Sequence, residues 1–371
     1  MFESLRSIPA KSNIFSTVTF LLIIIVIISS DSIISNVSLN SDVLMHESSG
    51  EDRDHDHHLS RVLHTKSADG EGFNSEITYF FSRNRCRVRL FMTWISPADF
   101  FGERELFGLE SLFKTNPKGC LIILSNTLDS IHGSKLLQPL IEIGFRVRAI
   151  SLDLSSLFND TPAEIWFDQI KNGSKNAGEI PLPQNLSNLI RLAALYKYGG
   201  VYLDTDFIIL KDLSRLRNSI GAQSVDVNGN WTRLNNAILV FDKNHQLVYK
   251  FMEEFASTFD GNIWGHNGPY LVTRVVDRVV RVRDFNFTIL PPIVFYPVDW
   301  IRIPRFFARP DHNDLAEQKW VTAKLRHLSR ASYGVHLWNR QSSRLRIEEG
   351  SVISSLISDY CILCNTPISS S

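Results

Sequence analysis

Residues 186–211 constrain the fold of this chain more than any other segment, and their sequence is LSNLIRLAALYKYGGVYLDTDFIILK. Apolar side chains recur from Leu186 at i, i+3, i+4 and i+7, a spacing that predicts a helix with one buried face. Gly199 and Gly200 are expected to end this helix, because glycine accepts the left-handed conformation found at helix C-termini. The apolar run that follows, 201–210, predicts a strand that two aspartates interrupt.

Asp204 and Asp206 are those two aspartates, and their spacing is the strongest functional signal in the chain. Carboxylates at i and i+2 point to the same face of an extended segment. Between apolar flanks, two adjacent charges are costly unless they are paired or bind a metal. A hard divalent cation meets this need, and the diphosphate of a nucleotide sugar supplies further oxygen ligands. The alternative is a strand-end turn with two solvated aspartates.

The sequence before this segment alternates between strand and helix patterns. Dense apolar runs at 88–95, 120–124 and 145–152 predict buried strands, and helical spacing occupies 103–114 and 136–143. This alternation predicts an α/β fold with a Rossmann-like sheet, whose ligand lies beyond the carboxyl ends of the strands. No G-x-G-x-x-G or G-x-x-x-x-G-K-[ST] sequence follows a strand. An ordinary dehydrogenase or P-loop enzyme is therefore disfavoured.

An apolar run at 14–28 follows the basic residues Arg6 and Lys11. Its length suits a thin secretory membrane, and the preceding charges keep the N-terminus cytosolic. The pattern predicts a cytosolic tail at 1–13 and a transmembrane signal anchor at 14–30, with the rest of the chain in the lumen. A cleaved signal peptide is the alternative, since small residues follow the apolar run.

The segment after the anchor is rich in serine, aspartate and histidine and has few large apolar side chains. Such a composition cannot bury enough surface to offset the entropy lost on ordering, so residues 31–80 are interpreted as a flexible stem. One catalytic domain is predicted at 85–345, and residues 346–371 are interpreted as a C-terminal extension.

Two further features agree with a lumenal location. Six N-x-S/T sequons are present, at Asn36, Asn159, Asn172, Asn185, Asn230 and Asn286. Asn185 is also a candidate helix cap. The four cysteines are Cys86, Cys120, Cys361 and Cys364. They allow three pairings in an oxidising lumen, and for the C-terminal C-x-x-C a structural disulfide is favoured over redox chemistry.

The charge of the chain is balanced. Lysine plus arginine and aspartate plus glutamate each total 39, so the formal net charge is +0. Nucleic-acid-binding proteins normally carry a basic excess, so no nucleic-acid partner is expected. A sugar nucleotide needs only a local countercharge, which a bound metal can supply.

Four motifs together resemble one known family: RLAALYKYGGVYLDTD, NNAILVF, WGHNGPYLVTRV and YGVHLWN, within about Arg89 to Ile347. They are similar to the D-x-D sugar-binding region of the glycosyltransferases grouped with α-1,4-galactosyl- and α-1,4-N-acetylglucosaminyltransferases. Yeast mannosyltransferases and clostridial glucosylating toxins are related. The amino-acid sequences of the motifs most resemble those of plant members.

The resemblance implies a GT-A fold and a single-pass type II protein of the Golgi membrane with a lumenal catalytic domain. It implies transfer of a hexose or N-acetylhexosamine from a nucleotide sugar, a UDP-sugar rather than a GDP-sugar, to a glycan or glycolipid acceptor. Retention of the donor's anomeric configuration and Mn²⁺ or Mg²⁺ as cofactor are also implied.

Carried onto this sequence, the resemblance implies that Asp206 binds the metal directly and that Asp204 contacts the ribose and the metal shell. Arg191 would face the donor. The family usually has aspartate where this chain has Asn188, whose amide can still accept a hydrogen bond. The other donor-binding candidates are Asn235, Asn236, Asn267, Gly268 and Trp338. A polar strand start is the alternative for the asparagine pair, and an ordinary turn is the alternative for the N-G-P loop.

His336, in YGVHLWN, is predicted to complete the metal site. Val335 and Leu337 alternate with it as on a strand, which points the imidazole away from the apolar face. A neutral imidazole suits manganese, and the following Trp338 could help close over the donor. The alternative is a histidine satisfied by backbone hydrogen bonds beside a packed tryptophan.

Two other functions compete with glycosyl transfer. A glycosidase needs two carboxyl groups on opposite sides of the scissile bond, ~5 to 9.5 Å apart. Asp204 and Asp206 are expected to share a face and no second acidic motif stands out, so this function is disfavoured. The second competitor is a catalytically silent lumenal protein of the same fold that binds glycans or partners.

Overall fold

The computed structural model describes residues 70–282, 285–311 and 313–364, all within the compact unit Leu59–Ser371. The predicted cytosolic tail, the transmembrane anchor and most of the predicted stem lie outside these residues. Within the described ranges, no helix combines the length and the apolar character that a membrane span requires.

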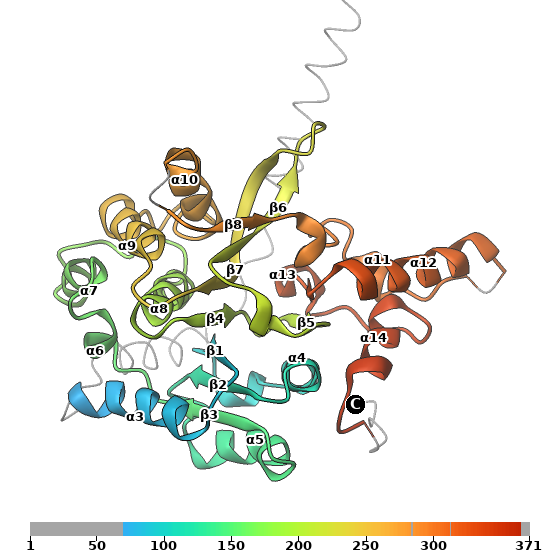
Figure 1. The fold of residues 1–371 in the computed structure, drawn as a ribbon, viewed down its shortest axis with the longest axis horizontal. Helices are drawn as coiled ribbons and strands as arrows, with labels where there is room; N and C mark the ends of the chain where they lie inside the picture. The colour runs from blue at the N-terminus through green and yellow to red at the C-terminus, as the bar shows by residue number, and fades with distance from the viewer. Residues whose placement is uncertain (1–69, 283–284, 312, 365–371) are drawn as a thin grey trace, which may run out of the picture. The chain divides into compact units, whose positions relative to one another are not determined.

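A mixed seven-stranded sheet with the order β3-β2-β1-β4-β7-β6-β8 forms the centre of the fold (Figure 1). Its strands are β1 (Val88–Thr93), β2 (Gly119–Leu124), β3 (Arg146–Ile150), β4 (Gly200–Leu203), β6 (Ser219–Val225), β7 (Trp231–Phe241) and β8 (Thr288–Leu290). The first four strands run parallel to one another, whereas β7 is antiparallel to both β4 and β6. The predicted α/β class with a parallel sheet is confirmed, and the three strands predicted first are β1, β2 and β3.

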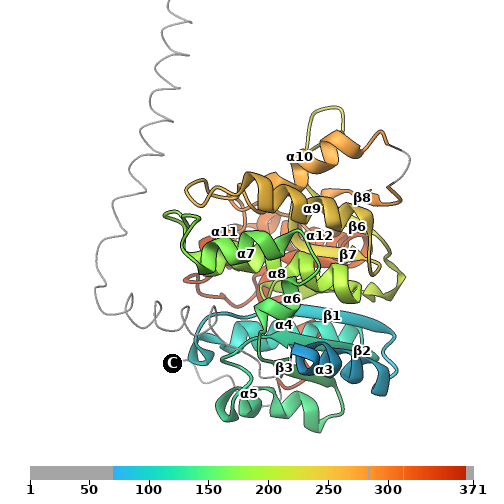
Figure 2. The same ribbon diagram turned by 90° about the vertical axis from the view of Figure 1, so that its left-hand side faces the viewer.

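Helices cover both faces of this sheet. One layer, seen face-on in Figure 2, consists of α3 (Gly70–Arg83), α6 (Leu154–Phe158), α7 (Ala163–Lys171), α8 (Leu182–Tyr198), α9 (Gln246–Thr258) and α10 (Pro269–Val279). The other face packs against α4 (Glu103–Thr115) and α5 (Ile131–Glu142). Alternation along β1 serves both layers, because Phe91 belongs to the first hydrophobic core and Leu90 and Met92 to the second.

A two-stranded sheet joins the middle of the chain to its C-terminal part. Its strands, β5 (Phe207–Ile209) and β9 (Gly334–His336), pair antiparallel. A third hydrophobic core lies around them and includes side chains of α11 (Pro304–Phe307), α12 (Leu315–Ala331) and α14 (Val352–Tyr360). The short helix α13 (Asn339–Ser342) follows β9.

The predicted domain boundaries differ from the structure at both ends. Helix α3 lies in the range interpreted as stem, yet Phe73, Ile77 and Phe81 are buried in the first core. Their spacing of i, i+4 and i+8 gives one apolar face, which the polar composition around it masked. Helix α14, in the predicted extension, likewise buries side chains in the third core. The folded domain therefore begins earlier than residue 85 and ends later than residue 345.

Two disulfides are present, Cys86–Cys120 and Cys361–Cys364. The first joins the residues before β1 to strand β2, and the second closes a turn after α14. Both cysteine pairs are bonded, so one of the three possible pairings is selected and the described chain has no free thiol.

Candidate metal and donor site

The connection from α8 to β4 follows the predicted helix, glycine pair and strand. Gly199 caps α8 with a φ of 65°, and Gly200 has a φ of 120°. A Cβ atom at either position would also clash with backbone, at 2.5 Å from the Lys243 nitrogen or 2.5 Å from the Arg89 oxygen. Both glycines are therefore required by conformation and by close approach, and they deliver β4 to the centre of the sheet.

Asp204 and Asp206 lie on a turn between the two sheets rather than on one interrupted strand. The Asp204 backbone nitrogen donates to Ala237 of β7 at 2.8 Å. The Asp206 backbone oxygen instead accepts from Leu337, which follows β9, at 2.8 Å. The prediction that both carboxylates share a face of a single extended segment is wrong, because the chain changes sheets at the motif.

The turn nevertheless brings both carboxylates to one imidazole. One ligand atom from each of Asp204, Asp206 and His336 lies within 4.8 Å of the other two. His336 Nε2 is 3.3 Å from Asp206 Oδ1, and β5–β9 pairing sets this approach because Phe207 is opposite His336 in the register. His336 is buried, and its Nδ1 has no hydrogen-bond partner among the described residues. Two carboxylates and an imidazole form a donor set that suits a divalent cation such as manganese.

The two carboxyl groups differ electrostatically. Burial raises the pKa of Asp204, and although Arg191 opposes this effect, the nearby charge of Asp206 adds to it. Burial also acts against the charge of Asp206, but His336 and a hydrogen bond from the Asn339 backbone outweigh it and lower its pKa. The Asn339 nitrogen lies 2.9 Å from Asp206 Oδ2. The negative charge of the two carboxylates is therefore not fully balanced at Asp204. An additional positive charge would be most stabilising there.

Arg191 holds Asp204 from the side of α8. Its guanidinium contacts the two carboxylate oxygens at 3.1 and 3.3 Å and the Asn236 backbone oxygen at 2.8 Å. Its remaining hydrogen bonds go to the backbone oxygen and the hydroxyl of Ser187, at 3.2 and 3.1 Å. Burial opposes the charge of this arginine, but Asp204 outweighs it and raises the Arg191 pKa. All five donors are engaged within the chain, so Arg191 fixes Asp204 and does not extend toward solvent.

The two adjacent asparagines of β7 have separate environments, because successive strand residues face opposite sides. Asn236 Nδ2 donates to Asn188 Oδ1 at 2.8 Å. Asn235 Nδ2 instead donates to Gln223 at 2.9 Å, and its Oδ1 accepts from the backbone of Ala237. Asn236 and Asn188 thus lie beside Arg191 and the aspartates, whereas Asn235 is tied to strand β6.

Neighbouring residues of the N-G-P loop also have different environments. A Cβ atom at Gly268 would lie 2.8 Å from Asn188 Oδ1, so glycine is needed for α10 to begin beside the asparagine pair. Asn267 is buried at 2% exposure, and its amide bonds to Asn185 and to both backbone groups of Asp260. Asn267 therefore holds the loop together and offers no free polar group to a ligand.

Trp338 packs against the triad of Asp204, Asp206 and His336 through its contact with His336. Its ring meets His336 edge-on, with centroids 4.3 Å apart, and its indole N–H donates to the Val298 oxygen at 2.9 Å. The backbone of Trp338 is left-handed, with a φ of 55°, and α13 starts directly after it. Trp338 orients His336, and its side chain is already committed to protein contacts rather than free to close over a donor.

Two tyrosines complete the site, and neither was singled out from the sequence. The Tyr202 hydroxyl lies 3.1 Å from Asp204 Oδ1, and burial raises the Tyr202 pKa to about 12. The Tyr296 ring is 5.7 Å from the His336 ring, and burial followed by the Asp204 charge raises the Tyr296 pKa. Tyr202 lies in the apolar strand pattern directly before the D-x-D, so the sequence could have identified it as a site residue. Tyr296 comes from an irregular aromatic and proline segment whose sequence carries no such signal.

Comparison with known proteins identifies the class of protein that carries this site. Residues 102–226 match the glycosyltransferase sugar-binding region containing the DXD motif, and residues 240–367 match the α-1,4-glycosyltransferase conserved region. Human lactosylceramide 4-α-galactosyltransferase is 34% identical over 265 residues, which cover 68% of this chain and 69% of that protein. The chain belongs to this family of α-1,4-glycosyltransferases.

Other relatives match more distantly or over a smaller share of their length. Human α-1,4-N-acetylglucosaminyltransferase is 29% identical over 222 residues, 57% of this chain and 58% of that protein. An uncharacterized Arabidopsis thaliana protein is 33% identical over 79% of this chain, but this chain spans only 45% of its length. Among solved structures, the PaToxG glycosyltransferase has a TM-score of 0.38 at 18% identity, covering 62% of this chain and 80% of that one.

Proposed function

We propose that this chain is a metal-dependent, retaining glycosyltransferase of GT-A fold. It transfers a hexose or N-acetylhexosamine from a nucleotide sugar, a UDP-sugar in preference to a GDP-sugar, to a glycan or glycolipid. The observation that carries the proposal is the triad of Asp204, Asp206 and His336 at the carboxyl end of β4, in a chain of this family. The relatives' names support the substrate classes, because one transfers galactose to lactosylceramide and another transfers N-acetylglucosamine.

Asp204, Asp206 and His336 would hold the metal. When bound, it would neutralise the charge that develops on the leaving nucleoside diphosphate, a contribution of several kcal/mol to the barrier. The chain's own residues keep the ligands in position: Arg191 and Tyr202 hold Asp204, and the Asn339 nitrogen holds Asp206.

Asn188 and Asn236 form the polar wall beside the triad. Their amides bond to each other, and the Asn188 Nδ2 also donates to the Gln184 oxygen at 3.1 Å. A network of neutral amides can accept and donate hydrogen bonds without adding charge, which suits the hydroxyl groups of a donor sugar.

The Golgi lumen is the proposed location, with a type II anchor at 14–30. The exposure of Asn159, Asn172, Asn230 and Asn286 supports glycosylation there. Asn185 is different: it lies inside α8 rather than at its cap, is 4% exposed and accepts a hydrogen bond from Asn267. Protease treatment of sealed microsomes should spare the folded domain, and digestion of the intact chain without detergent would refute this topology.

The enzymatic proposal is tested with the full-length chain in detergent and a panel of UDP- and GDP-sugars. We expect manganese-dependent hydrolysis of at least one UDP-sugar in the absence of acceptor, since water can replace an acceptor hydroxyl. A folded chain that binds manganese but turns over no nucleotide sugar would favour the silent glycan-binding protein instead.

A further inference from the structure

The loop 259–268 between α9 and α10 presents apolar side chains to solvent. Ile263 is 51% exposed and Trp264 is 48% exposed. The two side chains are adjacent in the chain, and an exposed indole offers a large apolar surface together with an N–H donor, which suits a binding contact. Trp264 lies in the WGHNGP motif, from which the proposed function uses only Gly268.

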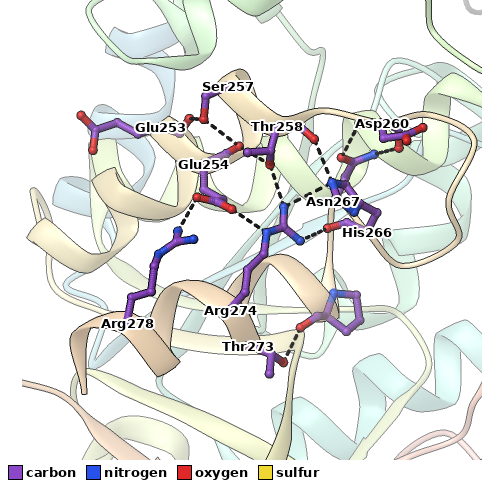
Figure 3. Close-up of polar contacts among 11 residues, drawn as sticks. Glu253, Glu254, Ser257, Thr258, Asp260, His266, Asn267, Thr273, Arg274 and Arg278 are labelled. Atoms are coloured by element: carbon purple, nitrogen blue, oxygen red, sulfur yellow. Dashed lines mark hydrogen bonds and ion pairs between the residues drawn. The ribbon is translucent and has the colours of Figure 1, made fainter. Parts of the chain in front are cut away.

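A network of polar contacts ties the base of this loop to the two flanking helices (Figure 3). Arg274 of α10 donates to Glu254 at 2.5 Å, to the His266 oxygen at 2.8 Å and to the Thr258 hydroxyl at 2.8 Å, which ties both helices to the loop. Asn267 adds its bonds to Asp260. Arg274 and Arg278 of α10 both pair with Glu254 of α9. This clamp of Glu254 with Arg274 and Arg278 fixes the loop backbone next to Trp264, which lowers the ordering entropy that binding there would cost.

The tip of the loop reaches the C-terminal side of the metal site. The Arg340 guanidinium carbon lies 4.0 Å from the centroid of the Trp264 ring. Arg340 directly follows Asn339, whose nitrogen binds Asp206, and Trp264 lies four residues before Gly268, which contacts Asn188. The Trp264–Arg340 pair is therefore connected along the chain both to the residue that bonds Asp206 and to the glycine beside Asn188. Within the described part of the chain, the Arg340 side chain is exposed and has no ion pair.

We propose that Trp264 and Arg340 form the subsite for the acceptor, and that its occupant is a terminal hexopyranose. One face of a pyranose ring consists of C–H groups, which pack on an indole, while its hydroxyls can accept hydrogen bonds from a guanidinium fork. The metal triad accounts for the charged donor, whereas an aromatic ring with one cation suits a neutral sugar. This inference rests on the proposed function and adds where the acceptor binds.

The test measures binding and catalysis separately on the full-length chain in detergent. Binding of methyl β-galactoside, methyl β-lactoside and methyl β-N-acetylglucosaminide is followed by saturation-transfer NMR in the presence of UDP and manganese. We expect at least one glycoside to bind. Trp264→Ala should raise its dissociation constant at least tenfold and Trp264→Phe less, while donor hydrolysis without acceptor stays within threefold of wild type.

Trp320→Ala is the matched control. Trp320 lies on α12, outside the proposed site, and the Arg305 guanidinium carbon is 4.1 Å from the centroid of its ring. The substitution should leave glycoside binding unchanged. If wild type hydrolyses donor but binds none of the three glycosides, or if Trp264→Ala binds as well as wild type, the acceptor subsite is refuted and the enzymatic proposal stands. If Trp264→Ala lowers hydrolysis and thermal stability together, Trp264 is structural and the subsite is also refuted. Absence of hydrolysis in wild type refutes the proposed function itself.

Discussion

Two groups of charged side chains in this protein both combine carboxylates with arginine, but they differ in the balance between negative and positive charge. At the clamp, the single carboxylate of Glu254 meets two guanidinium groups, those of Arg274 and Arg278. At the site, two carboxylates meet Arg191 and His336, which is charged only if protonated. The clamp is complete without a ligand, whereas the site is short of positive charge.

The pKa shifts express the same contrast. Burial opposes the charge of Glu254, but hydrogen bonds from Arg274 and Arg278 outweigh it and lower its pKa. Burial raises the pKa of Asp204 despite its contact with Arg191. A carboxylate whose charge remains destabilised in the folded chain, as at Asp204, marks a place where a bound positive charge would be stabilising. Four substitutions sharpen this comparison.

The largest expected effect follows from removing a proposed metal ligand. Asp206→Asn should lower nucleotide-sugar turnover by roughly a thousandfold or more, about 4 kcal/mol of barrier, with the far-UV spectrum unchanged. The measurement is manganese-dependent donor hydrolysis at saturating donor. Asp226→Asn, in the turn between β6 and β7, is a control that should retain activity. Turnover of folded Asp206→Asn within threefold of wild type would exclude metal-dependent catalysis at this site.

The second effect concerns stability at the same turn. Repulsion between the two carboxylates, considered alone, would make the removal of either one cost little stability. The contacts of Arg191 lead to a different expectation for Asp204→Ala, which leaves a buried guanidinium without its partner and should destabilise the fold by about 3 kcal/mol. Urea unfolding measures the difference. Asp204→Asn retains an oxygen acceptor and should therefore lose less stability. Equal losses of stability in the two variants would contradict the role given to Arg191.

The clamp predicts a pH-dependent loss of stability. Because the pKa of Glu254 is lowered in the folded chain, its stabilisation is present above the pKa of an unfolded glutamate, about 4.3. It is lost as pH falls through the lower, folded value. Glu254→Gln should therefore cost about 2 kcal/mol at pH 7 and progressively less below pH 4. Thermal unfolding across this range is the measurement. Glu253→Gln on the same helix, at a partly exposed residue that pairs with Lys250, should have little effect at any pH.

The smallest effect is expected at His336. His336→Ala should weaken manganese binding by roughly tenfold, about 1.4 kcal/mol, as measured by calorimetry and by the manganese concentration for half-maximal turnover. In wild type, binding should also weaken as pH falls, because a protonated imidazole cannot be a ligand. His327→Ala, at an exposed position of α12, is the control. Unchanged manganese affinity in folded His336→Ala would remove the histidine from the site and leave the aspartates.

Local patterns were sufficient for much of the fold and for part of the site. The helix before the motif, its end at Gly199 and the strands β1 to β3 follow from side-chain periodicity and glycine conformation, which act over a few residues. The two aspartates were recognisable because their neighbours are apolar. The same patterns missed α3, whose apolar face lies among polar side chains, and α14, a short helix of only 9 residues.

Tertiary structure decided which candidates meet. His336 lies beside Asp206 because β9 pairs with β5 in a register that no local pattern specifies. It also separated Asn236 from Asn235, turned Asn267 inward and brought the unpredicted Tyr296 to the triad. Sequence alone determined the class of chemistry, since residue type and short-range spacing set what a segment can bind. The complete site depends on contacts between segments far apart in the chain, which form only when hydrophobic burial fixes their relative positions.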